Sequence, residues 1–211
     1  MLRKYLKYLA AFIVFVVILT NSIYIRKLSD VNAASTKKKF DSERYASEFW
    51  TNKLIPSLNK AIEINALTGL LKKEPEQTFK KYAHALGIGN LKYFMVKGSG
   101  LVQSVDENSI AILVTTPQDK NKVSVETEYV YGNAVRDASG IIRMNEFDNT
   151  MDFNEVSAEI NKIIRTKVLP GFKANVKKGD SVQFTGAIEL NQKHLNLVAM
   201  EVTPIVLKII N

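Results

Sequence analysis

Residues 94–116 contain the run FMVKGSGLVQSV (94–105), the turn DENS (106–109) and the run IAILVTT (110–116). Two runs rich in β-branched and other aliphatic residues that flank a short polar turn predict a β-hairpin. Gly98 and Gly100 interrupt the first run, where glycine marks a bend in a strand or the close approach of another backbone. The hairpin therefore favours a curved sheet over a flat one.

The strand pattern continues toward the C-terminus. Residues 122–130 and 181–190 alternate between apolar and polar side chains, which is the period of a half-buried strand. Residues 195–210 predict a last strand, in which Pro204 indicates an edge or a bend. Residues 152–164 place apolar side chains on one helical face and predict a short helix before the last two strands. Five strands with one inserted helix predict a small closed or half-closed β-barrel.

The region before the hairpin has a helical period. Pro56 and Pro75 suit the first turns of two helices, and apolar side chains follow each at helical spacing. We therefore expect a helical subdomain at residues 40–92, packed as a cap on a barrel subdomain at residues 93–211. The fold class predicted for the folded part is α+β.

The N-terminal segment, residues 1–28, contains the apolar run LAAFIVFVVIL at residues 9–19 after a basic start. Residues 5–25 approach the roughly 20 residues that span a bilayer as a helix. They predict a single-pass transmembrane helix, a signal anchor with the C-terminal domain outside the cytoplasm. A cleaved signal peptide, cut near residues 31–33, is the alternative and gives the same location for the domain. The polar residues 29–39 predict a linker.

Positive charge is concentrated near this segment. The chain carries 29 Lys and Arg against 21 Asp and Glu, and residues 1–40 hold eight basic residues against one acidic residue. The remainder therefore holds 21 basic and 20 acidic residues, a net charge of +1. Nucleic acid is not an expected partner, because its binding needs a basic surface on the folded domain. The expected partner of the N-terminal helix is membrane lipid.

The chain has no cysteine. This excludes disulfides, thiolate nucleophiles and cysteine zinc sites. Neither His84 nor His194, the only histidines, has acidic or histidine residues at the spacing of a metal site or a triad. We therefore expect no catalytic residue, no metal and no cofactor.

Residues 131–164, YGNAVRDASGIIRMNEFDNTMDFNEVSAEINKII, resemble the bacterial family called domain of unknown function 2291, predicted periplasmic lipoproteins. Matching positions are Gly132, Ala134, Val135, Arg136 and Asp137, followed by Phe147 and Asn149. The chain departs from the family in lacking the lipobox cysteine. The resemblance implies an exported protein with an oligonucleotide/oligosaccharide-binding (OB) type of barrel and a helical part. It also implies genes that lie beside sugar uptake systems of the ABC type, and no established activity.

Arg136 and Asp137 are the most interesting pair for ligand binding. Arg136 can offer a guanidinium fork to a carboxylate, a phosphate or sugar hydroxyls, with Asp137 orienting it; the alternative is that the pair only pins a loop. Asn149 and Gly132 complete the set of ligand-binding candidates. Glu126 and Glu128 are interpreted as part of a solvated strand face.

These observations leave three functional hypotheses. The leading one is a membrane-anchored, non-catalytic accessory or binding protein that acts with the permease or solute-binding protein of a sugar uptake system. The second is a direct carbohydrate-binding protein that uses Arg136 and Asp137. The third is a hydrolase whose carboxylates come together only in the folded chain.

Overall fold

The computed structural model describes residues 2–22, 27, 40–87, 89–117, 120–198 and 200–210. The chain divides into two compact units, Met1–Phe40 and Asp41–Asn211. The predicted linker at residues 29–39 and the alternative cut near residues 31–33 lie outside the described residues. The finer division into residues 40–92 and 93–211 stays a prediction.

The N-terminal unit contains helix α1, Leu2–Ser22. The prediction that this region spans a membrane is wrong, since no helix in the described part of the chain combines the length and the apolar character that a crossing requires. The uninterrupted apolar run at residues 9–19 has 11 residues. As a helix it extends about 16 Å at 1.5 Å per residue, about half of the roughly 30 Å hydrocarbon core.

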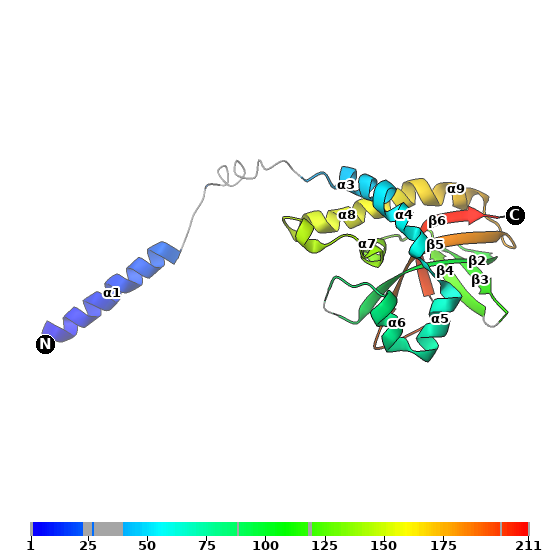
Figure 1. Ribbon diagram of the computed structural model, residues 1–211. Coiled ribbons are helices and arrows are strands. Elements are labelled where there is room, and N and C mark those ends of the chain that lie inside the picture. The colour runs from blue at the N-terminus through cyan, green and yellow to red at the C-terminus, as the bar shows by residue number, and fades with distance from the viewer. Residues whose placement is uncertain are drawn as a thin grey trace. The chain divides into compact units, whose positions relative to one another are not determined.

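The second unit is built on a closed β-barrel (Figure 1). Its strands follow the order β2-β3-β4-β6-β5, and pairing of β5 with β2 closes the ring. Neighbours are antiparallel except β4 and β6, which are parallel. The strands are β2 (Leu91–Val105), β3 (Ser109–Thr115), β4 (Lys120–Glu126), β5 (Ser181–Asn191) and β6 (Met200–Ile209).

Alternation along these strands fills the barrel with apolar side chains. Phe94, Val96, Ile112 and Val125 are among the interior side chains that are fully buried. A Cβ atom on Gly100 would collide with the backbone carbonyl of Leu113 on β3, so glycine allows β2 to bend while staying paired. The register between β5 and β6 shifts near Pro204, which confirms the predicted bend in the last strand.

Helices pack against the barrel interior. Helices α5 (Ile64–Lys73) and α6 (Pro75–Tyr82) contribute Leu67, Leu71 and Phe79 to the same hydrophobic cluster as the barrel interior. Helix α9 (Leu169–Asn175) adds Phe172. The predicted helix after Pro56 is interrupted, because Ile62 and Glu63 form the short strand β1, which pairs with β2.

A second layer of helices packs outside the barrel. Helix α3 (Ser42–Phe49) lies against α8 (Thr150–Ile163), the helix inserted before the last two strands (Figure 1). The rings of Tyr45 and Phe147 meet edge to face at 5.3 Å, and Phe147 meets Phe153 of α8 at 5.4 Å. These contacts fix the segment between β4 and α8 against the two helices α3 and α8.

That segment contains one more helix, α7 (Ala134–Ser139), which contacts β2, β5 and β6. Its limits follow from glycine on each side. Gly132 and Gly140 have φ values of +79° and +63°, a left-handed conformation that side chains with a Cβ disfavour. Gly140 ends the helix at its C-cap.

Candidate ligand-binding site

Three cavities on the outside of the barrel share α7 as a wall. Four of the six helix residues are buried, and two of those four carry charges. We describe first the two cavities that contain the residues singled out in the sequence.

Arg136 and Asp137 form a buried ion pair at the centre of α7. Their exposed fractions are only 3% and 5%, and Arg136 Nε donates to Asp137 Oδ1 at 2.7 Å. Arg136 Nη1 also donates to the carbonyl of Phe153 at 3.1 Å, and the guanidinium lies 3.6 Å from the centre of the Phe153 ring. The pair therefore ties α7 to the first turn of α8.

Arg136 nevertheless has N–H donors, those of Nη2, that are not used by the described part of the protein. Its Nη2 makes no hydrogen bond with a described residue. Nη2 is also not one of the fully buried side-chain atoms without a hydrogen-bond partner in the described chain. Part of its surface is therefore exposed. The residue lines a cavity of about 330 Å³, here called the Arg136 cavity. We infer that Nη2 is accessible from this cavity.

The Arg136 cavity combines polar groups with apolar walls. Its polar lining includes Tyr93, Asn133, Arg136, Asp137 and Asn154, and its apolar lining includes Leu86, Leu91, Met144 and Phe153. A concave site with mostly apolar walls and a few convergent polar groups is the usual form of a small-molecule site. The volume lies at the small end of the roughly 300–1,000 Å³ that such sites occupy.

Tyr93 connects this cavity with a second one. Burial raises the pKa of Tyr93 above its ordinary value, and the side chain of Glu189 raises it further. The charge of Asp137 also raises the pKa of Tyr93, and the charge of Arg136 lowers it. Tyr93 and Glu189 are direct cross-strand partners on β2 and β5. The Tyr93 hydroxyl therefore stays protonated at neutral pH, with its one proton directed to the Glu189 carboxylate.

The second cavity, here called the glutamate cavity, has a volume of about 270 Å³. Glu126, Glu189 and Glu201 line it together with Tyr131, Gly132 and Thr203. Asn133 belongs to both cavities, so their walls are continuous. Within the described residues no group of three or more His, Cys, Asp or Glu is arranged to hold a metal ion.

Glu126 is the most perturbed carboxyl of this cavity. Burial raises its pKa, the hydrogen bond from Thr203 lowers it, and the charges of Glu201 and Glu189 raise it. Thr203 Oγ1 donates to Glu126 Oε2 at 2.6 Å. The interpretation of Glu126 as a solvated carboxylate is wrong, because the end of β4 lies half-buried beside β6. Glu128 follows the end of the strand and is exposed, and its carboxylate lies 3.0 Å from Lys173 Nζ.

The four candidate residues do not converge on one point. Arg136 and Asp137 line the Arg136 cavity and Gly132 lines the glutamate cavity. Asn149 is the N-cap of α8, where its side chain accepts from the Asp152 amide at 2.8 Å, and it lines neither cavity. A ligand-binding role for the four residues stays a prediction.

Sequence reasoning missed several residues of these cavities. Tyr93, Glu189 and Glu201 are outward-facing members of alternating strands, and such positions are normally solvated. Only the packing of α7 onto β2, β5 and β6 turns this face into cavity walls. Asn133 carried a weak signal, because asparagine is common before a helix, but its side chain makes no capping hydrogen bond.

Comparisons with known proteins agree on family and fold. A family model described as "Predicted periplasmic lipoprotein (DUF2291)" matches residues 12–208. A crystal structure of an OB-fold protein from Thermotoga maritima is similar at 27% sequence identity and a TM-score of 0.73, covering 82% of this chain and all of that chain. No curated protein matches the chain. The OB-like barrel of the predicted fold class therefore has a close structural neighbour.

Proposed function

The chain belongs to the family of predicted periplasmic lipoproteins named domain of unknown function 2291, and on this premise we propose that it is a non-catalytic, extracytoplasmic carbohydrate-binding protein. The proposal depends on one observation, the convergence of hydrogen-bonding groups of both kinds in the Arg136 cavity. The family description itself supports a location outside the cytoplasm and assigns no activity.

The cavity offers what a sugar requires. Arg136 Nη2 is a donor, the Asp137 carboxylate and the Tyr93 hydroxyl oxygen are acceptors, and the side-chain amides of Asn133 and Asn154 supply both. A sugar hydroxyl both donates and accepts, so it can satisfy such a mixed set. Its C–H faces can pack on Leu86, Leu91 and Met144, which line the same cavity.

The charge balance favours a neutral ligand. The Arg136 guanidinium is already paired with Asp137 at 2.7 Å. An anionic ligand would compete with Asp137 for it, and a cationic ligand would compete with Arg136 for Asp137. A buried charge without a partner is costly, so an uncharged polyol fits the pair better than an ion does.

The same contacts argue for binding rather than catalysis. Arg136 and Asp137 are engaged with each other, and the raised pKa of Tyr93 keeps its hydroxyl protonated, so it supplies no phenolate base at neutral pH. A hydrolase would need a second carboxyl acting with the half-buried Glu126 across the glutamate cavity. Release of reducing sugar from an oligosaccharide by the purified chain would replace the binding proposal with the hydrolase.

Thermal unfolding of the full chain with a panel of neutral mono- and disaccharides tests the binding. A ligand of the folded state at 100 times its Kd adds about 2.7 kcal/mol to the free energy of unfolding. Asn133→Ala should weaken sugar binding about tenfold, the loss of one hydrogen bond of roughly 1.4 kcal/mol. Its fold should persist, because the Asn133 side chain does not cap α7.

Asn149→Ala is the matched control, since it also removes one exposed asparagine before a helix but lies outside both cavities. It should leave the sugar Kd unchanged. No rise in the unfolding temperature with any sugar of the panel, or equal Kd changes in the two variants, would contradict the proposal.

We further propose that the protein serves a sugar uptake system as an accessory. The support is the family resemblance and its association with such systems. Chemical crosslinking of the full chain in its own cells should recover a permease or a solute-binding protein. The Asn133→Ala variant should still be crosslinked if the partner contacts another surface. Recovery of neither component would rule out this accessory role and leave the carbohydrate cavity to its own test.

A further inference from the structure

The third cavity beside α7, here called the Lys60 cavity, has a chemistry unlike the other two. It measures about 280 Å³. Its walls come from separate parts of the chain: residues 57–62, which precede α5, together with α6, β2 and the C-terminal end of α7. Its basic residues are Lys60, Lys81 and His84, and no acidic side chain lines it.

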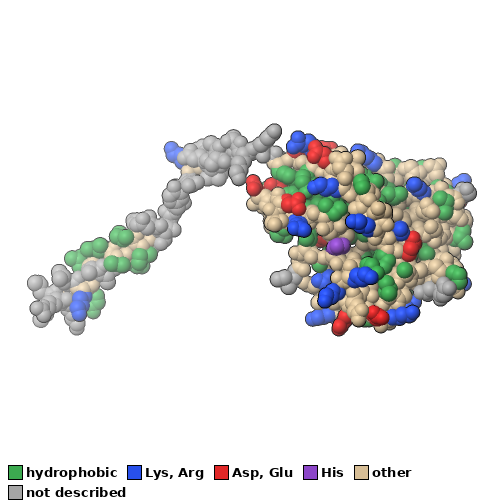
Figure 2. Space-filling model, in the orientation of Figure 1, with side chains coloured by type: hydrophobic (Ala, Val, Ile, Leu, Met, Phe, Trp, Pro, Cys, Tyr) green, Lys and Arg blue, Asp and Glu red, His purple; other side chains and the backbone are tan. Residues whose placement is uncertain are grey.

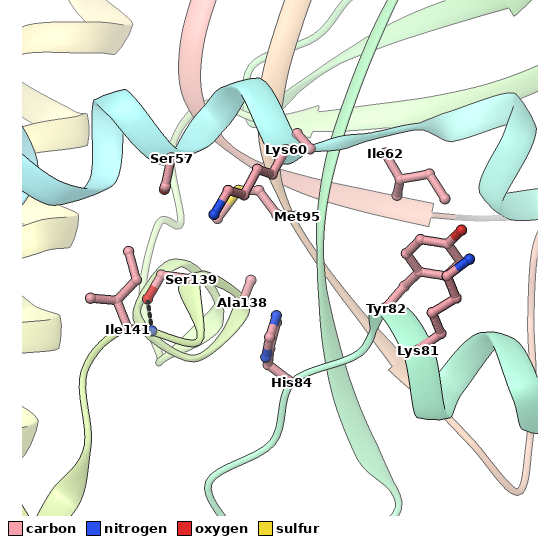
Figure 3. A pocket seen from close by; sticks show the side chains of 11 residues that line it. Ser57, Lys60, Ile62, Lys81, Tyr82, His84, Met95, Ala138, Ser139 and Ile141 are labelled. Carbon is pink, nitrogen blue, oxygen red and sulfur yellow. Dashed lines mark hydrogen bonds between the residues drawn. The ribbon is translucent and has the colours of Figure 1, made fainter.

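The two ammonium groups of this cavity have no acidic partner in the part of the chain that the structure describes. Neither Lys60 nor Lys81 forms an ion pair with a described residue. Lys81 Nζ lies 4.9 Å from the centre of the Tyr82 ring, a cation–π contact that holds it near the cavity. Figure 3 shows the Lys60 side chain and the His84 ring directed toward the same space from opposite sides.

His84 is exposed but held in place by its surroundings. Its backbone exchanges two hydrogen bonds with Tyr93 of β2, at 2.8 and 2.9 Å. Its ring lies so close to Gly140 that a Cβ atom there would come within 2.5 Å of ring atoms Nδ1 and Cε1. The left-handed glycine that ends α7 therefore also makes room for the imidazole in the cavity wall.

The remaining lining is apolar or already satisfied. Ile62, Met95 and Ala138 contribute aliphatic surface. The hydroxyl of Ser139 donates to the Arg136 carbonyl at 2.6 Å, and that of Ser57 donates to the Leu54 carbonyl at 2.7 Å. The donors left for a ligand are the two ammonium groups, the imidazole and the Tyr82 hydroxyl. Lysine ammonium groups bind phosphate as point charges.

We propose that the Lys60 cavity binds a small organic molecule that carries a phosphate or a similar oxyanion. The oxyanion lies between Lys60 and His84, and the organic part packs on Ile62 and Met95 and extends toward Tyr82 and Lys81 at the other end of the cavity. This site is separate from the carbohydrate cavity on the other side of α7 and favours an anion where that cavity favours a neutral ligand, because no acidic side chain in the lining balances its lysines.

Isothermal titration of the full chain with glycerol 3-phosphate, inorganic phosphate and glycerol tests the proposal at constant ionic strength. Glycerol 3-phosphate should bind most tightly, inorganic phosphate more weakly, and glycerol not at all. The double variant Lys60→Ala/Lys81→Ala should lose at least about tenfold in affinity for glycerol 3-phosphate, given roughly 1.4 kcal/mol per tenfold and hydrogen bonds to charged groups of that size or more. Both side chains are exposed, so the fold should be unaffected.

Lys80→Ala is the matched control, because Lys80 is the exposed neighbour on α6 and lines a different pocket. It should keep the wild-type Kd. Equal losses in the Lys80 variant and the double variant would mean general charge attraction and would overturn the site. Complete loss of binding when the dilute buffer salt is replaced by potassium chloride would also overturn the site. Failure here leaves the carbohydrate proposal untouched, since Asn133 does not line the Lys60 cavity.

Discussion

The buried side chains inside the barrel have no polar atoms, as Phe94, Val96 and Ile112 illustrate. On α7, by contrast, the charged side chains of Arg136 and Asp137 are buried as well. The barrel gains stability in proportion to the apolar area removed from water. A buried ion pair gains little, because the cost of desolvating two charges is close to the attraction between them. The barrel therefore accounts for folding, and the pair on α7 needs another explanation.

The position of the pair suggests that explanation. Its charges fix α7 to the carbonyl of Phe153 and leave Arg136 Nη2 accessible from a cavity. An apolar pair could hold the helix equally well but would offer nothing to a ligand. Charge on both sides of α7 is also divided: carboxylates line the glutamate cavity and lysines line the Lys60 cavity. Figure 2 shows basic and acidic side chains interspersed over one face of the unit, without a continuous basic stripe on that face.

The largest expected effect comes from breaking the pair on one side. Asp137→Ala leaves the Arg136 guanidinium buried without its carboxylate and should lower the free energy of unfolding by about 3–5 kcal/mol. Urea denaturation of the full chain measures this. The double variant Arg136→Met/Asp137→Leu should recover most of that loss yet fail to bind sugar. A single variant as stable as the wild type would mean that the pair is solvated, and the contrast with the barrel would disappear.

A smaller effect is expected within the barrel. Gly100→Ala places a Cβ atom against the Leu113 carbonyl and 2.8 Å from Ile112 Cγ2, which should cost about 1–3 kcal/mol by overpacking. Gly69→Ala is the matched control, because no atom lies within 4 Å of its added Cβ on α5. It should stabilise the chain by about 0.5–1 kcal/mol through helix propensity. Thermal unfolding distinguishes the two, and equal shifts would contradict the assigned bend in β2.

The barrel was largely predictable from the sequence because its signals are local. Alternation in residues 122–130 and 181–190 located β4 and β5, and the run from residue 94 located β2 and the turn to β3. The last strand begins at Met200 rather than at residue 195. Closure of the ring depends on the distant pairing of β2 with β5, which a periodic pattern suggests but does not encode.

The candidate site was predictable only in part. Arg136 and Asp137 stood out as a charged pair, but a helix of six residues is too short to show a helical period, so α7 was expected to be a loop. Burial of the pair requires α8, which follows it along the chain, and also β2 and β5, which are far from it in sequence. The prediction of a membrane-spanning helix was wrong for the opposite reason. It counted the weakly apolar flanks within residues 5–25 together with the short apolar run at residues 9–19.

Loss of the N-cap of α8 should lower the free energy of unfolding modestly without changing sugar affinity. Asn149→Ala removes the side chain that accepts from the Asp152 amide at 2.8 Å, which should cost about 1 kcal/mol. Urea denaturation measures the loss, and titration with the sugar that binds best measures affinity. Asn149→Asp, which keeps an oxygen acceptor, should restore stability. A changed sugar Kd in Asn149→Ala would return this residue to the ligand site and weaken its use as a control.

The smallest effect is a pH dependence at Glu126, where the barrel strand β4 ends and the segment leading to α7 begins. Burial raises the pKa of Glu126 above its ordinary value of 4.5, the bond from Thr203 opposes that rise, and the charges of Glu201 and Glu189 add to it. The folded chain therefore holds this proton more tightly than the unfolded chain does. Its contribution to stability is complete below pH 4.5 and is lost as pH rises through the folded-state pKa.

Glu126→Gln keeps an acceptor for the Thr203 hydroxyl and removes the charge. Its stability relative to the wild type should therefore improve as pH rises above 4.5 and should show no such gain below that value. Denaturant unfolding at several pH values measures the difference, with Glu128→Gln as the exposed control. A gain that grows as pH falls would mean that Glu126 is held ionised by its neighbours. The glutamate cavity would then behave as a solvated strand face, and α7 would not enclose the carboxyl groups that line it.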